Sequence, residues 1–149
     1  MEKPVIISIK GTQTTEPGQE DVMELVTQGT LRGESGDFTV SYLESELTGL
    51  DGTTTTFHIE PDQITLTREG TLNSVMVFQV GKRHYSPYQT PFGGISLGVN
   101  TQKAFSDMSE TGGNISIRYI MEVENERVSE NAFDIQVSEP TAGTLPLRQ

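Results

Sequence analysis

The sequence contains no cysteine, and this absence excludes several kinds of protein. The fold has no disulfide framework, no thiolate metal ligands and no cysteine nucleophile. Secretion does not require cysteine, so its absence favours the cytoplasm without excluding other compartments. A chain of 149 residues buries about 68–70% of its unfolded surface on folding, which is enough for one domain without covalent cross-links.

Basic residues are scarce. The chain has 10 lysines and arginines against 21 aspartates and glutamates, which gives a formal net charge of −11. Nucleic-acid affinity rests mainly on Lys and Arg contacts to phosphate, so this excess of acid predicts no nucleic-acid partner and disfavours anionic membranes. The simplest explanation of the acidity is that it keeps the protein in solution.

Long apolar runs are also lacking. The first apolar stretch, in MEKPVIISIKG, is short and is interrupted by Ser8 and Lys10. A signal peptide needs an apolar stretch of about 7–15 residues, and a spanning helix needs about 20. We therefore expect neither segment and no membrane insertion.

The sequence instead shows apolar and polar residues alternating with period two, which is typical of half-buried strands. About eight to ten short antiparallel strands, separated by turn signals, predict a single closed or nearly closed β-barrel. The hairpins are mostly sequential, including one with its turn at Gly81-Lys82, and this favours an up-and-down barrel. We expect the barrel over residues 1–139 and a flexible tail over 140–149.

Three segments are less regular. Residues 101–110, TQKAFSDMSE, have some helical spacing but are short and uncapped, so a strand is preferred. Two prolines in KRHYSPYQTPFG are expected to limit sheet pairing there. A change of phase between Val128 and Phe133 predicts a β-bulge near Asn131.

Four stretches, YLESELTGLDGTTTT, ITLTREGTLNSVMVF, GKRHYSPYQTPFG and VSENAF, together resemble the YwiB-like family of uncharacterised proteins from Bacillus and related Gram-positive bacteria. The likeness runs from about Val5 to Val137. It implies a calycin-like β-barrel, related in shape to lipocalins and fatty-acid-binding proteins. It brings no activity and no site residues, so any function has to be argued from the residues themselves.

The inward faces of the predicted strands form an apolar lining with a few polar residues set into it. Glu44 ends the inward stripe that contains Tyr42, and an unpaired buried carboxylate costs several kcal/mol. Arg68 is the expected partner, because its guanidinium can bind a carboxylate with two hydrogen bonds. Glu46 is expected at the rim of the barrel, in contact with water.

The turn at Gly81-Lys82 leaves one alternative open. A two-residue turn directs Arg83 and Tyr85 into the barrel, whereas a three-residue bulged turn directs His84, Ser86 and Tyr88 inward. The candidate ligand-binding residues in the interior are Tyr42, Glu44, Arg68, Ser74, Met76, Phe78, Arg83 and Tyr88.

Two hypotheses about function follow. The first is a cytoplasmic barrel that binds a small, largely apolar or fatty-acid-like ligand, with Arg68 and Tyr42 holding its polar end. The alternative is a solid barrel in which Glu44 and Arg68 form a structural pair, acting as a protein-interaction module with no small-molecule ligand. No metal site is predicted, because the histidines lack ligand spacing. No catalytic residues and no cofactor are predicted either. Glu44 and Glu46 lie on one wall rather than on two sides of a bond, as a glycosidase requires.

Overall fold

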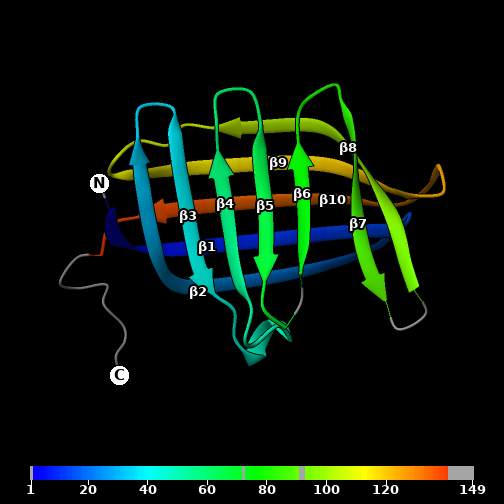
Figure 1. Cartoon of the computed structure of the whole chain (residues 1–149), viewed down its shortest axis with the longest axis horizontal. Helices are drawn as coiled ribbons and strands as arrows, with labels where there is room; N and C mark the ends of the chain where they lie inside the picture. The colour runs from blue at the N-terminus through cyan, green and yellow to red at the C-terminus, as the bar shows by residue number, and fades with distance from the viewer. Residues whose placement is uncertain (1, 72, 91–92, 141–149) are drawn as a thin grey trace.

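The computed structural model describes residues 2–71, 73–90 and 93–140, with side chains 47 and 88–90 left out. Residues 141–149 of the expected tail lie outside this part of the chain. The described residues are almost entirely strand, which confirms the all-β prediction (Figure 1). The elements are β1 (Glu2–Glu16), β2 (Gln19–Glu34), β3 (Asp37–Leu43), the 3-10 helix η1 (Glu46–Thr48), β4 (Thr54–Ile59), β5 (Ile64–Glu69), β6 (Ser74–Phe78), β7 (Arg83–Thr90), β8 (Gly93–Ser106), β9 (Gly112–Val123) and β10 (Glu126–Ser138).

The ten strands form one antiparallel sheet that curls into a nearly closed up-and-down barrel. Their order is β6-β5-β4-β3-β2-β1-β10-β9-β8-β7, so chain neighbours are sheet neighbours except at one place. The first and last strands of the chain pair with each other in the middle of this sheet, with Ile6 opposite Ser138. The exception is a seam between β6 and β7, which are the two ends of the sheet. The Gly81-Lys82 hairpin was therefore wrong as a paired hairpin, because β6 pairs with β5 and β7 with β8.

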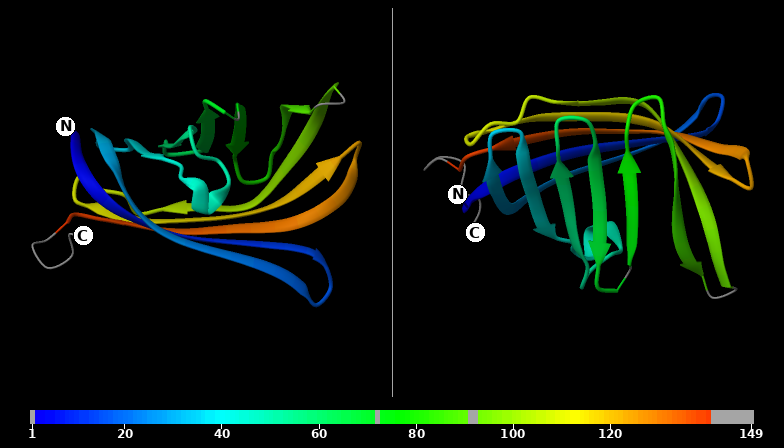
Figure 2. Two further views of the ribbon diagram at one scale, coloured as in Figure 1. Left: turned by 90° about the horizontal axis from the view of Figure 1, so that it is seen from below. Right: turned by 45° about the horizontal axis from the view of Figure 1, so that its top comes forward.

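The barrel has two walls whose strands cross. The long strands β1, β8, β9 and β10 form one wall, and the short strands β3 to β6 cross over it (Figures 1 and 2). The β2 strand belongs to both walls, because it pairs with β1 along most of its length and with β3 at its end. Gly29 lies at this transfer, where a Cβ would come within 2.3 Å of the Ser41 carbonyl oxygen. Only glycine fits such a close approach of two backbones.

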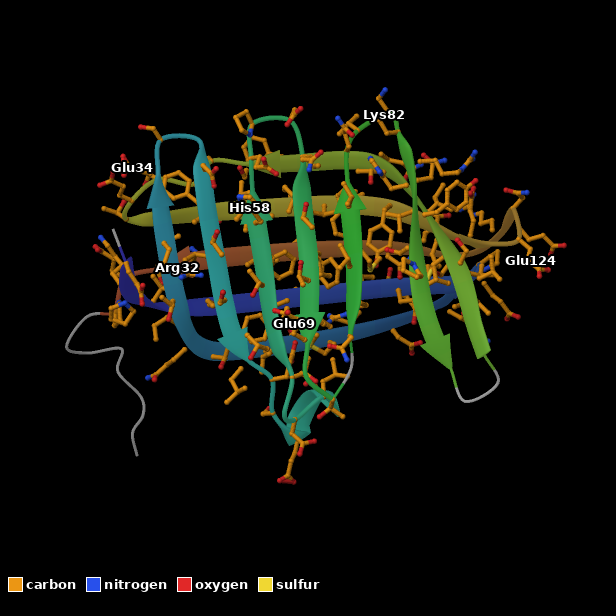
Figure 3. All side chains as sticks on the ribbon, viewed as in Figure 1. Arg32, Glu34, His58, Glu69, Lys82 and Glu124 are labelled. Atoms are coloured by element: carbon orange, nitrogen blue, oxygen red, sulfur yellow. The ribbon has the colours of Figure 1, made fainter. Side chains whose placement is uncertain are left out.

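Apolar side chains from both walls fill most of the space between them. Phe57 of the short wall meets Phe133 of the long wall edge to face, with ring centroids 6.1 Å apart. Phe78 and Tyr119 make a second contact across the walls at 4.8 Å. Charged side chains such as Arg32, Lys82 and Glu124 remain exposed at the surface (Figure 3). The predicted apolar lining is therefore a packed core, whose buried members include Phe38, Val40, Phe57, Ile59, Ile64, Leu66, Met76, Phe78, Ile117 and Tyr119.

Three local predictions have different outcomes. Residues 101–106 are strand, as preferred, and extend β8. The β7 strand pairs with β8 along its whole length despite Pro87, so the expected loss of pairing was wrong. Edge strands tolerate proline because only one of their sides needs ladder hydrogen bonds. The bulge in β10 lies between Arg127 and Ser129, slightly before the predicted position. No helix in the described residues is long and apolar enough to cross a membrane.

Candidate functional site

Two neighbouring rows of inward-facing residues cross the right-hand end of the long wall in Figure 1. In the first row, Asp21 lies opposite Gln13, Gln13 opposite Asn131, and Asn131 opposite Tyr119. In the second row, Met23 lies opposite Gly11, and Gly11 lies opposite Phe133. One polar row therefore runs beside one apolar row.

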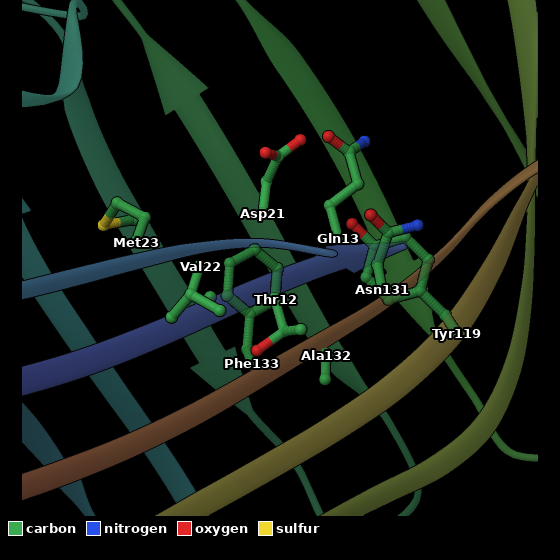
Figure 4. A pocket seen from close by; sticks show the side chains of 10 residues that line it. Thr12, Gln13, Asp21, Val22, Met23, Tyr119, Asn131, Ala132 and Phe133 are labelled. Carbon is green, nitrogen blue, oxygen red and sulfur yellow. The ribbon is translucent and has the colours of Figure 1, made fainter. Parts of the chain in front are cut away.

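A pocket of about 220 Å³ lies over these two rows. Side chains alternate along a strand, so the residues around the pocket point in two directions. Asp21, Gln13 and Met23 extend to one side of the strands, and Val22 and Thr12 extend to the other (Figure 4). Thr12, Val22 and Ala132 stand between the two inward rows along their strands, and they border the pocket there. The complete lining is Gly11, Thr12, Gln13, Asp21, Val22, Met23, Tyr119, Asn131, Ala132 and Phe133. We call this space the end pocket.

Gly11 leaves room for the end pocket in the middle of the apolar row. A Cβ at this position would lie 3.7 Å from the Met23 methyl carbon and 3.7 Å from a Phe133 ring carbon, which is ordinary van der Waals contact. The backbone there does not require glycine, since an added methyl group would clash with nothing. A glycine inside a strand often marks a place where something approaches the backbone closely.

Two aromatic rings line one side of the end pocket. The rings of Tyr119 and Phe133 are nearly parallel, with centroids 6.3 Å apart and planes inclined by 25°. Each ring also packs against an aromatic side chain of the short wall, Phe78 or Phe57. Burial raises the pKa of Tyr119 to about 12, and the nearby Arg68 charge opposes this rise. The rings are therefore held in place, and Tyr119 stays uncharged at neutral pH.

The polar row supplies oxygen atoms at the mouth of the end pocket. Asp21 and Gln13 are exposed, whereas Asn131 is half-buried. The side-chain nitrogen of Asn131 donates a hydrogen bond to the Ser129 hydroxyl at 2.9 Å, which fixes the orientation of the amide. One carboxylate and two carboxamides thus surround a largely apolar space.

The predicted residue Glu44 lies elsewhere, in a closed hydrogen-bond network. Its side chain is only 5% exposed. Its two carboxylate oxygens accept hydrogen bonds from the Thr48 hydroxyl at 2.8 Å and the Thr55 hydroxyl at 2.5 Å. The Tyr42 side chain is also hydrogen-bonded to Glu44, and the pKa of Tyr42 is raised by burial and then by this carboxylate. The network satisfies the buried carboxylate without a counter-ion at close range.

The expected ion pair between Arg68 and Glu44 was wrong. The ion pairs within 4.0 Å among the described residues do not include Arg68, and its buried Nε atom has no hydrogen-bond partner. The two threonine hydroxyls already occupy the carboxylate oxygens of Glu44. Arg68 acts at longer range instead, because its charge lowers the pKa of Tyr42 and Tyr119 against the effect of burial.

The other predicted candidates are spread over the core and the surface. Met76 and Phe78 are buried in the core, and Ser74 is half-buried at the start of β6. None of the seven candidates whose side chains are described lines the end pocket.

The alternative left open at Gly81-Lys82 is now resolved for part of β7. Arg83, expected as an interior candidate, lies on the outer face, where its Nε atom is 2.8 Å from a Glu122 carboxylate oxygen. The physical reason is the alternation of side chains along β7. Ser86, three residues after Arg83, is buried, so Arg83 falls on the opposite face. The Ser86 hydroxyl donates a hydrogen bond to the Val75 carbonyl oxygen across the seam. The side chain of Tyr88 lies outside the described part of the chain.

The comparisons with known proteins concern almost the whole chain. A family model described as "Domain of unknown function (DUF1934)" matches residues 7–135. A protein of Bacillus subtilis (strain 168) described as "Uncharacterized beta-barrel protein YwiB" is 26% identical over 126 residues, which is 85% of this chain and 87% of that protein. The crystal structure of the ywiB protein from Bacillus subtilis superposes with a TM-score of 0.80 at 24% identity, covering 94% of each chain. At this identity the likeness of the two structures supports the fold alone.

Proposed function

Because the chain belongs to the DUF1934 family, whose description states no function, we propose a function from geometry: the protein binds a small, largely apolar ligand in the end pocket. The observation that carries this proposal is the gap at Gly11, which opens between Met23 and Phe133 beside a polar row. Recessed apolar surfaces with a few well-placed polar groups are the usual form of small-molecule sites.

The size of the end pocket limits the ligand. Its volume of about 220 Å³ is below the range of roughly 300–1,000 Å³ that is usual for drug-sized ligands. The pocket therefore suits a single-ring molecule better than a long acyl chain. Arg68 and Tyr42, expected to hold the polar end of a fatty acid, do not line it.

A binding role is proposed rather than catalysis. Asp21 is the only carboxylate among the described residues that line the end pocket, and no histidine or lysine lies beside it there. General acid–base catalysis usually needs a proton donor or acceptor within hydrogen-bond reach of a reacting group, positioned by neighbours. The proposal also includes a location in the cytoplasm, which the lack of cysteine supports.

Filling the gap at Gly11 tests the proposal. A Cβ at Gly11 makes only ordinary contacts and valine suits a strand. The melting temperature of Gly11→Val shows whether the fold also accommodates its two Cγ methyl groups. These methyl groups occupy the space of the ligand, so binding should weaken at least tenfold. Binding of single-ring compounds can be followed through the Met23 methyl signal in NMR titrations. Ser8→Val is the matched control, because Ser8 lies on the same strand with its side chain exposed.

Two outcomes would contradict the proposal. Either no single-ring compound shifts the Met23 signal, or Gly11→Val binds as tightly as the unchanged protein. The alternative of a protein-interaction module would then gain weight. Its best surface is a groove of about 700 Å³ on the long wall, lined in part by Val26 and Phe105, which are 69% and 50% exposed.

A further inference from the structure

We propose that the ligand of the end pocket is a small organic cation, an amine or a quaternary ammonium compound with an apolar body. This inference rests on the proposed function and assigns the chemical class of the ligand. It follows from the charges and rings that surround the pocket, taken one at a time.

The charged lining of the end pocket has one sign. Asp21 is the only charged side chain among the described residues that line it. Its neighbours across the polar row, Gln13 and Asn131, each carry a side-chain carbonyl oxygen that can accept a hydrogen bond. A protonated amine donates hydrogen bonds and carries positive charge, so it matches this row better than an anion or a neutral acceptor does.

The aromatic side of the pocket favours the same charge. The faces of aromatic rings carry partial negative charge and attract cations within about 6 Å of the ring centroid. Tyr119 and Phe133 are held nearly parallel and border the same space as Asp21. A carboxylate ligand would be repelled by Asp21, whereas a cation placed over either ring would be attracted.

The charge of the whole chain acts in the same direction. The net charge of −11 produces a negative potential that raises the local concentration of cations and speeds their association. Ordinary solubility accounts for this charge by itself, so it supports the inference and does not carry it.

Arg68 is the one cation that acts against the proposal. Its charge is felt at the Tyr119 hydroxyl, but its side chain does not line the end pocket. The buried Glu44 carboxylate and Arg68 act on Tyr42 in opposite directions. At Tyr119, which lines the pocket, the Arg68 charge acts and the Glu44 charge does not. Arg68 therefore weakens the negative potential on that side, and Asp21 is the charge that a bound cation would contact.

Three probes of nearly equal size and different charge test the inference. Benzylammonium is the cation, benzyl alcohol the neutral compound and benzoate the anion, each titrated at pH 7 and low salt by NMR. We expect benzylammonium to bind at least tenfold more tightly than benzyl alcohol and benzoate to bind most weakly. The advantage of benzylammonium should shrink as salt rises, because Asp21 is exposed and screening weakens its attraction.

Asp21→Asn removes the charge while keeping the shape of the side chain. In this variant benzylammonium should lose about tenfold in affinity, whereas benzyl alcohol should bind as before. Glu24→Gln is the matched control, because Glu24 is an exposed acid on the same strand and does not line the end pocket.

The possible failures can be told apart. If benzyl alcohol or benzoate binds as tightly as benzylammonium, or Asp21→Asn leaves benzylammonium binding unchanged, the cation inference is wrong and the proposed function stands. If none of the three probes shifts the Met23 signal, both the inference and the proposed function fail.

Discussion

At the scale of single residues, Glu44 shows how an apolar stripe can end in an acid without an ion pair. Its neighbours on β4 and η1 supply threonine hydroxyls at hydrogen-bond distance, so the carboxylate is fully used inside the protein. Sequence reasoning identified the buried acid correctly, because it follows Tyr42 with strand spacing. It chose the wrong partner, because hydroxyl groups that arrive from an adjacent strand and a short helix leave no periodic signal.

Removing this carboxylate should be costly. Glu44→Ala removes the carboxylate that accepts from Thr55 and Tyr42 and one of the two acceptors of Thr48, which also reaches the Ser45 carbonyl oxygen. Unsatisfied buried donors cost about 1–3 kcal/mol each. We expect the free energy of unfolding to fall by about 3 kcal/mol, measured by urea denaturation. Glu46→Ala is the control, because Glu46 is exposed. A change equal to that of the control would show that the network adds nothing to stability.

The buried phenols predict a loss of stability in alkali. Burial raises the pKa of Tyr119 from 10.0 to about 12, and Tyr42 is shifted in the same direction. Below pH 10 the hydroxyl of Tyr119 is protonated in both the folded and the unfolded chain, so its contribution to stability is fully present. Between pH 10 and 12 the unfolded chain loses the proton first, and the free energy of unfolding falls by about 2 kcal/mol through this group.

Urea denaturation at pH 9 and at pH 11.5 measures this slope. Tyr119→Phe should make the fall with pH shallower than in the unchanged protein, because phenylalanine has no proton to lose. An equal slope in the two proteins would mean that Tyr119 ionises as easily in the folded state as in the unfolded chain.

At the scale of elements, two glycines in paired strands have opposite meanings. Gly29 lets β2 pass against β3, where a Cβ would lie 2.3 Å from the Ser41 carbonyl oxygen and 2.4 Å from the Ile7 side chain. At Gly11 of β1, a Cβ would make only ordinary van der Waals contacts, with the Met23 methyl group and the Phe133 ring. The sequence pattern is the same in both places, a glycine within a strand, and only the crossing of the walls distinguishes them.

A pair of alanine substitutions separates the two roles. Gly29→Ala forces backbone against backbone and should lower the free energy of unfolding by about 3 kcal/mol. Gly11→Ala should be neutral or stabilising by about 0.5–1 kcal/mol, because alanine loses less conformational freedom than glycine on folding. Thermal unfolding of the two variants measures the difference. Equal melting temperatures would show that β2 and β3 can separate at Gly29 without cost.

The strands themselves could be predicted from the sequence because the two faces of each strand differ so clearly. Phe38, Val40 and Tyr42, for example, alternate with polar residues, and all three are buried. The end pocket could not be predicted in this way. Asp21 and Met23 are exposed ends of their rows, and their partners across β1 and β10 depend on register, which the pattern of one strand does not fix. Gly11 was the one available signal.

At the scale of the whole molecule, the seam between β6 and β7 determines how the barrel closes. Prediction gave the barrel and its sequential order, because each strand pairs with its neighbour in the chain elsewhere. It missed the seam because Gly81 and Lys82 have the composition of a tight hairpin. The β7 strand pairs with β8 instead, and it diverges from β6 below the connection between β6 and β7 (Figure 1).

The pairing of β1 with β10 also constrains the order of folding. Ile6 pairs with Ser138, and the Lys3 ammonium group lies 2.7 Å from the Glu139 carboxylate. During synthesis the outer edge of β1 stays without its neighbour until nearly all of the described chain has left the ribosome. Such distant pairings are slow to form because a long loop must close first. The newly made chain therefore spends most of its synthesis with one apolar strand, containing Val5, Ile7 and Ile9, open to association with other chains.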